Sequence, residues 1–129
     1  MTYSEQLNAT KAAYPFAKWR SYFPGPHNNF EGMEDYTPEN CDQAEQILDT
    51  LIGQLIALGE HASKTEKEKQ FEQAVFALNS LNDATDGGLI ETGEREDLCE
   101  LLDAITIAAG LHPGDYADGE GIADEWREW

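Results

Sequence analysis

Apolar residues recur every three or four positions through long segments of the chain, which is the spacing of amphipathic helices. The clearest segment is 38–59, which begins after Thr37, a good N-cap residue followed by proline, and stops at Gly59. Similar stripes predict helices over 64–82 and 93–109. The apolar stripes should form one core containing Leu48, Leu51, Leu55, Leu78, Leu101, Leu102 and Ile105.

Capping and turn residues separate these predicted helices. Ser63 or Thr65 can cap the second helix, and Gly87 with its neighbouring glycine should end it. Thr92 can cap the third helix, and Gly110 is suited to its C-cap.

Shorter helices are predicted at the start of the chain. Thr2 and Glu5 form a capping box for a helix that runs toward Ala13, and Pro15 ends it. The aromatic-rich segment 14–23 predicts a second short helix. Its shared face should contain Phe16, Trp19 and Phe23.

Proline and glycine predict a loop over 24–36, and the residues 112–121 also have the composition of a loop. Ile122, Trp126 and Trp129, at spacings of four and three, predict a last short helix that docks on the others.

No segment alternates with period two, so we expect no substantial sheet. The predicted fold is all-α: an irregular helical bundle of three long helices plus short terminal helices, in a single domain over 1–129.

Negative charge dominates the chain, with 26 acidic against 8 basic side chains and a net charge of −18. Such a charge repels phosphate backbones and anionic membranes, so we expect neither nucleic acid nor a membrane as a direct partner. The basic residues Lys11, Lys18 and Arg20 face only Glu5 within residues 1–30, so the later part holds almost all the negative charge.

The start of the chain lacks the basic and apolar runs of a signal peptide, and no stretch approaches the roughly 18 apolar residues of a membrane span. We therefore expect a cytoplasmic protein. Cys41 and Cys99 lie far apart without metal-ligand spacing, which favours buried thiols over a disulfide or zinc site.

A calcium site is one alternative, because Asp83 to Glu94 lies between two predicted helices as an EF-hand loop does. Counting from Asp83 places Gly88, Ile90 and Glu94 correctly but puts Gly87 at a ligand position. Neither this register nor the one beginning a residue earlier is complete, so a plain turn is the simpler interpretation.

Catalytic and cofactor motifs are not recognisable in the sequence. His27, His61 and His112 are scattered and form no metal-binding pair, and there is no phosphate loop or nucleophile elbow. We expect a protein that is not an enzyme and needs no cofactor.

Acidic residues recur at helical spacing on two of the long helices, although like charges at such separations oppose helix formation. The first acidic stripe consists of Asp42, Glu45 and Asp49, and the second acidic stripe of Glu96, Glu100 and Asp103. The helix over 64–82 differs, because Lys64, Lys67 and Lys69 balance its glutamates and predict a solvated face. Both stripes are either solubilising surface or sites for a basic protein.

Aromatic side chains are the remaining candidates for partner binding. Trp19, Tyr22, Trp126 and Trp129 could supply the anchors of an interface rimmed by the acidic stripes, although such residues more often belong to a core. Tyr22 and Trp129 are expected to remain partly exposed.

The run Gly88 to Cys99, together with Asp124 to Trp129, resembles small acidic bacterial proteins of unassigned function, some of which are immunity proteins that neutralise toxins. The resemblance implies a non-catalytic inhibitor that occludes a basic toxin site, such as that of a nuclease, with its acidic helix faces. The calcium-binding protein and an acidic mimic of DNA are the alternatives. The oligomeric state does not follow from these residues.

Overall fold

The structure is a computed structural model that describes residues 1–23 and 35–129. Its helices are α1 (Tyr3–Ala9), α2 (Phe16–Arg20), α3 (Pro38–Leu58), α4 (Lys64–Ala84) and α5 (Thr92–Ala108). Short 3-10 turns are η1 (Thr10–Ala13), η2 (Pro113–Asp115), η3 (Ala117–Gly119) and η4 (Ile122–Glu125). The described residues contain no strand, which confirms the all-α class. Most of the loop predicted over 24–36, with His27, lies outside them.

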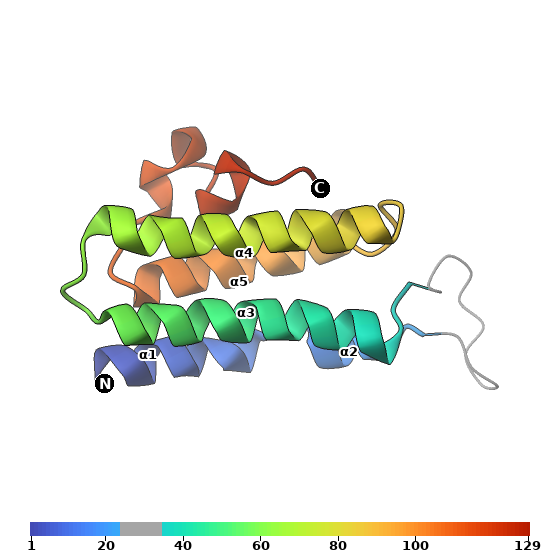
Figure 1. Cartoon of the computed structure of the whole chain (residues 1–129), viewed down its shortest axis with the longest axis horizontal. Coiled ribbons are helices and arrows are strands. Elements are labelled where there is room, and N and C mark those ends of the chain that lie inside the picture. The colour runs from blue at the N-terminus through green and yellow to red at the C-terminus, as the bar shows by residue number, and fades with distance from the viewer. Residues whose placement is uncertain (24–34) are drawn as a thin grey trace.

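The helices α3 and α4 lie side by side and antiparallel, and α5 runs behind them (Figure 1). The N-terminal segment, residues 1–23, follows α3 through α1 and α2, and the C-terminal tail, residues 112–129, folds over α4 and α5. The chain therefore wraps a central layer of long helices with its two ends.

Side-chain caps begin the helices where the sequence predicts them. The hydroxyl oxygens of Thr2, Thr37 and Ser63 accept hydrogen bonds from backbone N–H groups three residues later, each at 3.1 Å. Gly59 follows α3 with a φ of +89°, a conformation that glycine adopts without strain.

The sequence predicts Thr92 as the N-cap of α5, but Thr92 is the first residue of this helix. Glu91 occupies the N-cap position, and its side chain makes no capping hydrogen bond.

The helix α4 continues two residues past its predicted end at residue 82, because the turn after it supplies hydrogen-bond donors for its last carbonyls. The N–H groups of Asp86 and Gly87 donate to the carbonyls of Asp83 and Asn82, at 3.0 and 2.8 Å.

The C-terminal tail departs most from the prediction. The expected helix at 122–129 is only the 3-10 turn η4, and the expected loop over 112–121 contains η2 and η3. One reason is the side-chain amide of Asn79, which donates to the carbonyl of Trp126 and accepts from the N–H of Glu128, both at 3.0 Å. A tail whose backbone bonds to a neighbouring helix has fewer groups left for its own helix.

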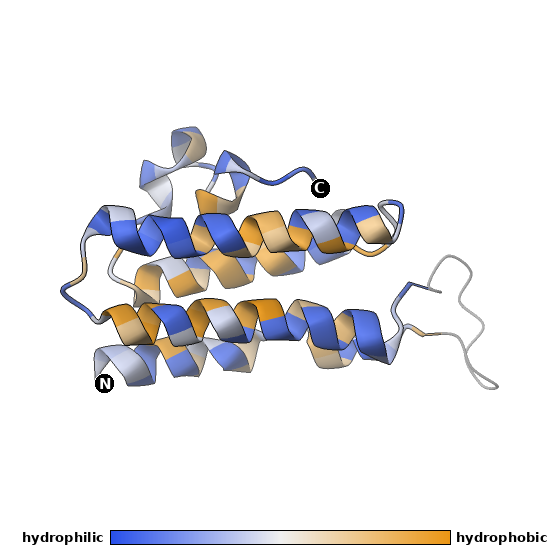
Figure 2. Cartoon of the chain, in the orientation of Figure 1, coloured by the Kyte–Doolittle hydropathy of each residue, from blue (hydrophilic) through white to orange (hydrophobic). Residues whose placement is uncertain are grey.

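All seven predicted core residues are buried, and Phe16 and Trp19 are fully buried with them. Phe23 is 39 % exposed, in contrast to the predicted shared face, because α2 ends at Arg20 and Phe23 lies beyond it. Apolar residues follow the inner sides of α3, α4 and α5 (Figure 2).

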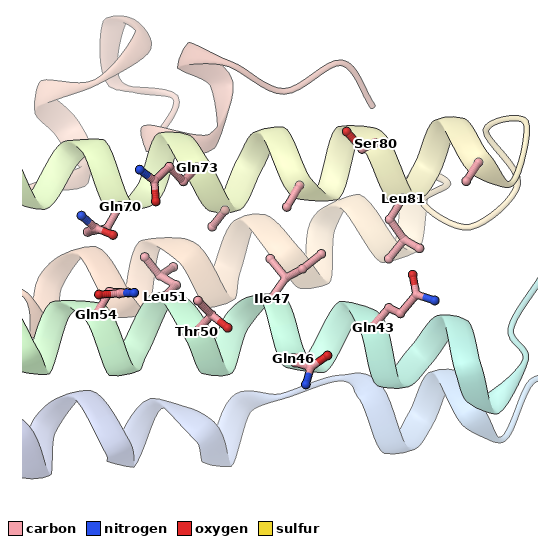
Figure 3. A pocket seen from close by; sticks show the side chains of 13 residues that line it. Gln43, Gln46, Ile47, Thr50, Leu51, Gln54, Gln70, Gln73, Ser80 and Leu81 are labelled. Carbon is pink, nitrogen blue, oxygen red and sulfur yellow. The ribbon is translucent and has the colours of Figure 1, made fainter.

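A groove of about 730 Å³ runs along the contact between α3 and α4 (Figure 3). Its apolar lining includes Ile47, Leu51, Leu81 and three alanines of α4, and glutamine side chains border it from both helices.

The substitution Leu48→Ala should lower the free energy of unfolding by about 2–5 kcal/mol, because the side chain is fully buried in α3 and its loss leaves a cavity. Urea denaturation followed by circular dichroism measures the change. The control Lys69→Gln, on the exposed side of α4, should alter stability by less than about 0.5 kcal/mol. Equal denaturation midpoints for both variants would contradict this core.

Candidate functional site

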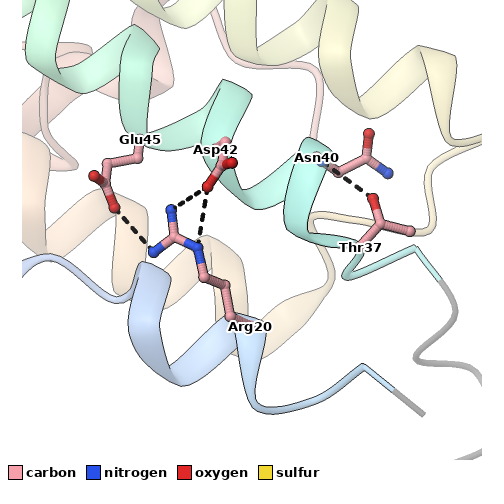
Figure 4. A network of polar contacts seen from close by, with 5 residues as sticks. All are labelled: Arg20, Thr37, Asn40, Asp42 and Glu45. Atoms are coloured by element: carbon pink, nitrogen blue, oxygen red, sulfur yellow. Dashed lines mark hydrogen bonds and ion pairs between the residues drawn. The ribbon is translucent and has the colours of Figure 1, made fainter. Parts of the chain in front are cut away.

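The first acidic stripe lies against the N-terminal segment. Arg20 of α2 donates from Nε and Nη2 to Asp42 Oδ1 at 3.2 and 2.7 Å, and from Nη1 to Glu45 Oε1 at 3.0 Å (Figure 4). One guanidinium thus joins two successive carboxylates of the stripe, one helical turn apart, to α2.

Asp49, the third member of that stripe, has its own partners from the same segment. The hydroxyl of Tyr14 donates to Asp49 Oδ1 at 2.8 Å, and Lys11 Nζ lies 3.7 Å from the same oxygen. Burial and the hydrogen bond to Asp49 raise the pKa of Tyr14 well above its usual range, so the phenol stays a donor.

The third basic residue of the segment, Lys18, forms an ion pair with Asp97 of α5 at 2.8 Å, and Trp19 Nε1 donates to the same carboxylate at 3.1 Å. All three basic residues of the segment therefore meet carboxylates of the long helices. The uneven distribution of charge along the sequence is therefore explained in part by these ion pairs, which join the basic start of the chain to the acidic helices that follow it.

The second acidic stripe has a different environment. Glu96 and Glu100 are exposed on α5, and neither forms an ion pair with any of the described residues. They are one helical turn apart, so their charges repel each other without an intervening cation. The structure thus separates two stripes that look alike in the sequence, one paired internally and the other facing solvent.

Asp103 completes the second stripe but lies half-buried under the C-terminal tail. Gly121 has a φ of +112°, a conformation that favours glycine, and a Cβ atom there would lie 2.7 Å from Asp103 Oδ1, so the tail packs closely against this carboxylate. Burial raises the pKa of Asp103, and the charge of Asp124 raises it further. The tail also brings Asp124 into an ion pair with Arg127.

The four aromatic candidates do not form one exposed patch. Trp19 is fully buried, and Tyr22 is half-buried with its ring centre 5.2 Å from that of Tyr36. Trp126 is half-buried in the tail. Trp129 is only 9 % exposed, so the predicted partial exposure is wrong; the guanidinium of Arg127 lies 5.7 Å from its ring centre.

Lys67 was predicted to lie on a solvated face, and this is wrong: it is 5 % exposed. Its ammonium donates to the carbonyls of Glu60 and Ala109 at 2.7 and 2.8 Å. The sequence holds a signal for this position, since Lys67 precedes Phe71 by four residues and so belongs to the buried face of α4.

The segment from Asp83 to Glu94 serves as the connection between α4 and α5. The carbonyl of Leu89, which would be the backbone ligand at position seven of a calcium loop, accepts from the hydroxyl of Tyr36 at 2.7 Å. Thr85, at position three, accepts from the N–H of Leu89 at 3.2 Å, and Glu94 is buried. The Leu89 carbonyl and the Thr85 hydroxyl therefore already have hydrogen-bond partners within the fold.

The remaining candidates among the described residues are possible metal ligands, the cysteines and two histidines. The part of the chain that the structure describes has no group of three or more His, Cys, Asp or Glu side chains able to hold a metal ion. Cys41 is buried, and burial raises the pKa of its thiol to about 11; Cys99 is half-buried, and both are free. His61 and His112 are exposed.

Comparisons with protein-family models, curated proteins and solved structures find no match to the chain. Across the described ranges, no helix combines the length and apolarity needed to cross a bilayer. The two acidic stripes and the α3–α4 groove are therefore the candidate functional surfaces of the described residues.

Charge reversal should separate the two stripes by their effect on stability. Asp42→Lys with Glu45→Lys removes both partners of Arg20 and adds two cations beside it, so the free energy of unfolding should fall by about 1 kcal/mol or more. Glu96→Lys with Glu100→Lys relieves a repulsion and should leave stability unchanged or slightly higher. Urea denaturation at low salt measures both, and equal losses would contradict the internal pairing.

Asp103→Asn should stabilise the protein at neutral pH. Because the pKa of Asp103 is raised in the folded state, folding binds a proton more tightly there, and stability is lost as pH rises through that pKa. The amide carries no charge to desolvate, so the gain should be present at pH 7 and disappear near pH 3, below the usual aspartate pKa of about 3.9. Thermal denaturation at both pH values tests this, and a gain of equal size at both would point to a different cause.

Proposed function

We propose that this chain is a non-catalytic protein-binding domain, an immunity-type inhibitor that occludes a basic site on a toxin. The observation that carries the proposal is the separation of the acidic stripes. Lys11 and Arg20 pair with the first stripe, whereas Glu96 and Glu100 of the second stripe stay exposed without an ion pair among the described residues.

Exposed carboxylates that follow one helix, without an ion pair in the part of the chain that the structure describes, suit a basic partner. Their mutual repulsion is relieved when a cation approaches, so association gains energy that a stripe already paired within the chain cannot supply. The net charge of −18 adds long-range attraction that guides a basic protein toward the chain.

The other candidate residues take supporting parts in this proposal. The first acidic stripe and Trp19 hold the N-terminal segment on α3 and α5, so they shape the scaffold. Asp103 of α5 lies beside Gly121 of the C-terminal tail, and η4 of the tail contacts α5, so the tail can border the site. The carbonyl of Trp126 bonds to Asn79 of α4 and the ring of Trp129 lies beside Arg127, so these two residues fix the tail. Only the exposed part of the second stripe is assigned to direct contact.

The double substitution Glu96→Lys with Glu100→Lys should slow association with the basic partner by about tenfold or more, because it reverses the charge that steers encounter. The probe is a basic protein recovered with this chain by pull-down from the native cell, or the product of an adjacent gene, and stopped-flow or surface plasmon resonance at several salt concentrations gives the rate. The rate for the variant should also depend less on salt, since fewer attractive charges are screened.

A matched control has the same change in net charge at another place. Glu5→Lys with Glu60→Lys alters two exposed residues, in α1 and in the α3–α4 connection, and should slow association much less. Circular dichroism should show that both variants fold. If the two pairs of substitutions slow association equally, net charge alone acts and α5 is not the site.

A further inference from the structure

The C-terminal tail, residues 112–129, is built from the short turns η2, η3 and η4 and lies over α4 and α5 (Figure 1). The side-chain amide of Asn79 on α4 bonds to the backbone of Trp126 and Glu128, both at 3.0 Å. Among the apolar side chains that the tail buries are Ile122 and Ala123. A segment of short turns can open while the long helices stay folded, because local opening breaks fewer contacts than global unfolding.

Two carboxylates approach each other where the tail crosses α5. Asp103 of α5 is half-buried, and no hydrogen bond or ion pair joins it to another of the described residues. The backbone of Gly121 packs against it, since a Cβ atom there would lie 2.7 Å from Asp103 Oδ1. Asp124 of η4 is the charged side chain that acts on Asp103. A half-buried carboxylate beside a second one is less stable in its charged form than in water.

The nearby cation serves other groups. Arg127 donates from Nε to Asp124 Oδ1 and from Nη1 to the carbonyl of Trp129, so its bonds lie within the tail. Cys99, one turn before Asp103 on α5, lies near the same charges, and burial raises the pKa of its thiol. The thiol therefore stays uncharged and adds no repulsion.

The other described elements that contact α5 have their charged side chains elsewhere. Lys11 of η1 lies 3.7 Å from Asp49, and Asp115 of η2 lies beside Tyr116 and the start of α4. Glu5 of α1 is exposed. Opening of the tail would therefore separate Asp103 mainly from Asp124 and from the backbone that covers it.

We propose that the tail is a proton-sensitive strap, which closes firmly on α5 while Asp103 is protonated and opens more often once Asp103 is ionised. The protonated carboxyl has no charge to desolvate and does not repel Asp124. Because η4 contacts α5, opening uncovers the part of α5 beneath the tail, beside the second acidic stripe. Opening requires no partner, so it can occur whether or not the chain is an inhibitor.

The direction of the pH dependence follows from linkage. Burial, and then the charge of Asp124, raise the pKa of Asp103 while the tail is closed. Closing the tail therefore tightens the binding of a proton at Asp103. The added stability of the closed tail is fully present below the usual aspartate pKa of about 3.9 and is lost as pH rises through the raised pKa.

Hydrogen exchange of the Glu128 amide, followed by NMR, tests the strap, because this N–H donates to Asn79 across the contact between the tail and α4. Its protection relative to an unstructured chain should fall by about threefold or more between about pH 4 and about pH 6.5. At both pH values it should be lower than that of the Leu51 amide in α3, since the tail opens while the long helices stay folded. Asp103→Asn should keep Glu128 protection near the acidic level of the parent throughout.

Glu100→Gln is the matched control, because it removes the same charge from an exposed residue of α5 one turn before Asp103. In this variant Glu128 protection should fall with pH as in the parent. In the parent itself, the carboxyl carbon of Asp103 should titrate over the pH range in which Glu128 protection falls, a measurement that needs no variant.

Three results would overturn the strap. Equal protection of the Glu128 and Leu51 amides means that the tail opens only when the whole chain unfolds. A parent whose Glu128 protection does not change with pH has no proton-sensitive tail. A fall that persists in Asp103→Asn, or that Glu100→Gln abolishes equally, assigns the effect to net charge instead of Asp103.

Discussion

One buried cation joins α1, α3, α4 and α5. The ammonium of Lys67 on α4 donates to the carbonyl of Glu60, just after α3, and to that of Ala109, at the end of α5, and it lies 5.1 Å from the ring centre of Tyr3 in α1. A buried ammonium without such partners costs several kcal/mol, so these helix ends are held at the positions that satisfy it. The carbonyls at a helix C-terminus carry partial negative charge, which adds to the attraction.

Elements whose formation depends on local sequence were predictable. The apolar spacing of α3 and the caps at Thr37 and Ser63 act within a few residues, so the bounds of the long helices follow closely. The C-terminal tail was not predictable in the same way, because its backbone bonds to Asn79, 47 and 49 positions earlier in the chain. No pattern within residues 122–129 contains that information.

The candidate site shows the same division between local and tertiary information. Helical spacing predicted two stripes of three carboxylates, but it did not indicate that Asp103 is half-buried under the tail while Glu96 and Glu100 are exposed. Nor could it distinguish the two stripes, since the partners of the first stripe come from another segment. Arg20 meets Asp42 and Glu45 across 22 and 25 positions, contacts that only the packing of α2 on α3 creates. Lys67 is the opposite case, because its position in α4, four residues before Phe71, indicates burial from the sequence alone.

Scarcity of positive charge explains how these features fit together. With 8 cations for 26 acidic groups, the chain cannot neutralise every surface, and the described contacts place its cations mainly where elements join. Joining elements this way leaves carboxylates exposed on α5, where repulsion favours a basic partner.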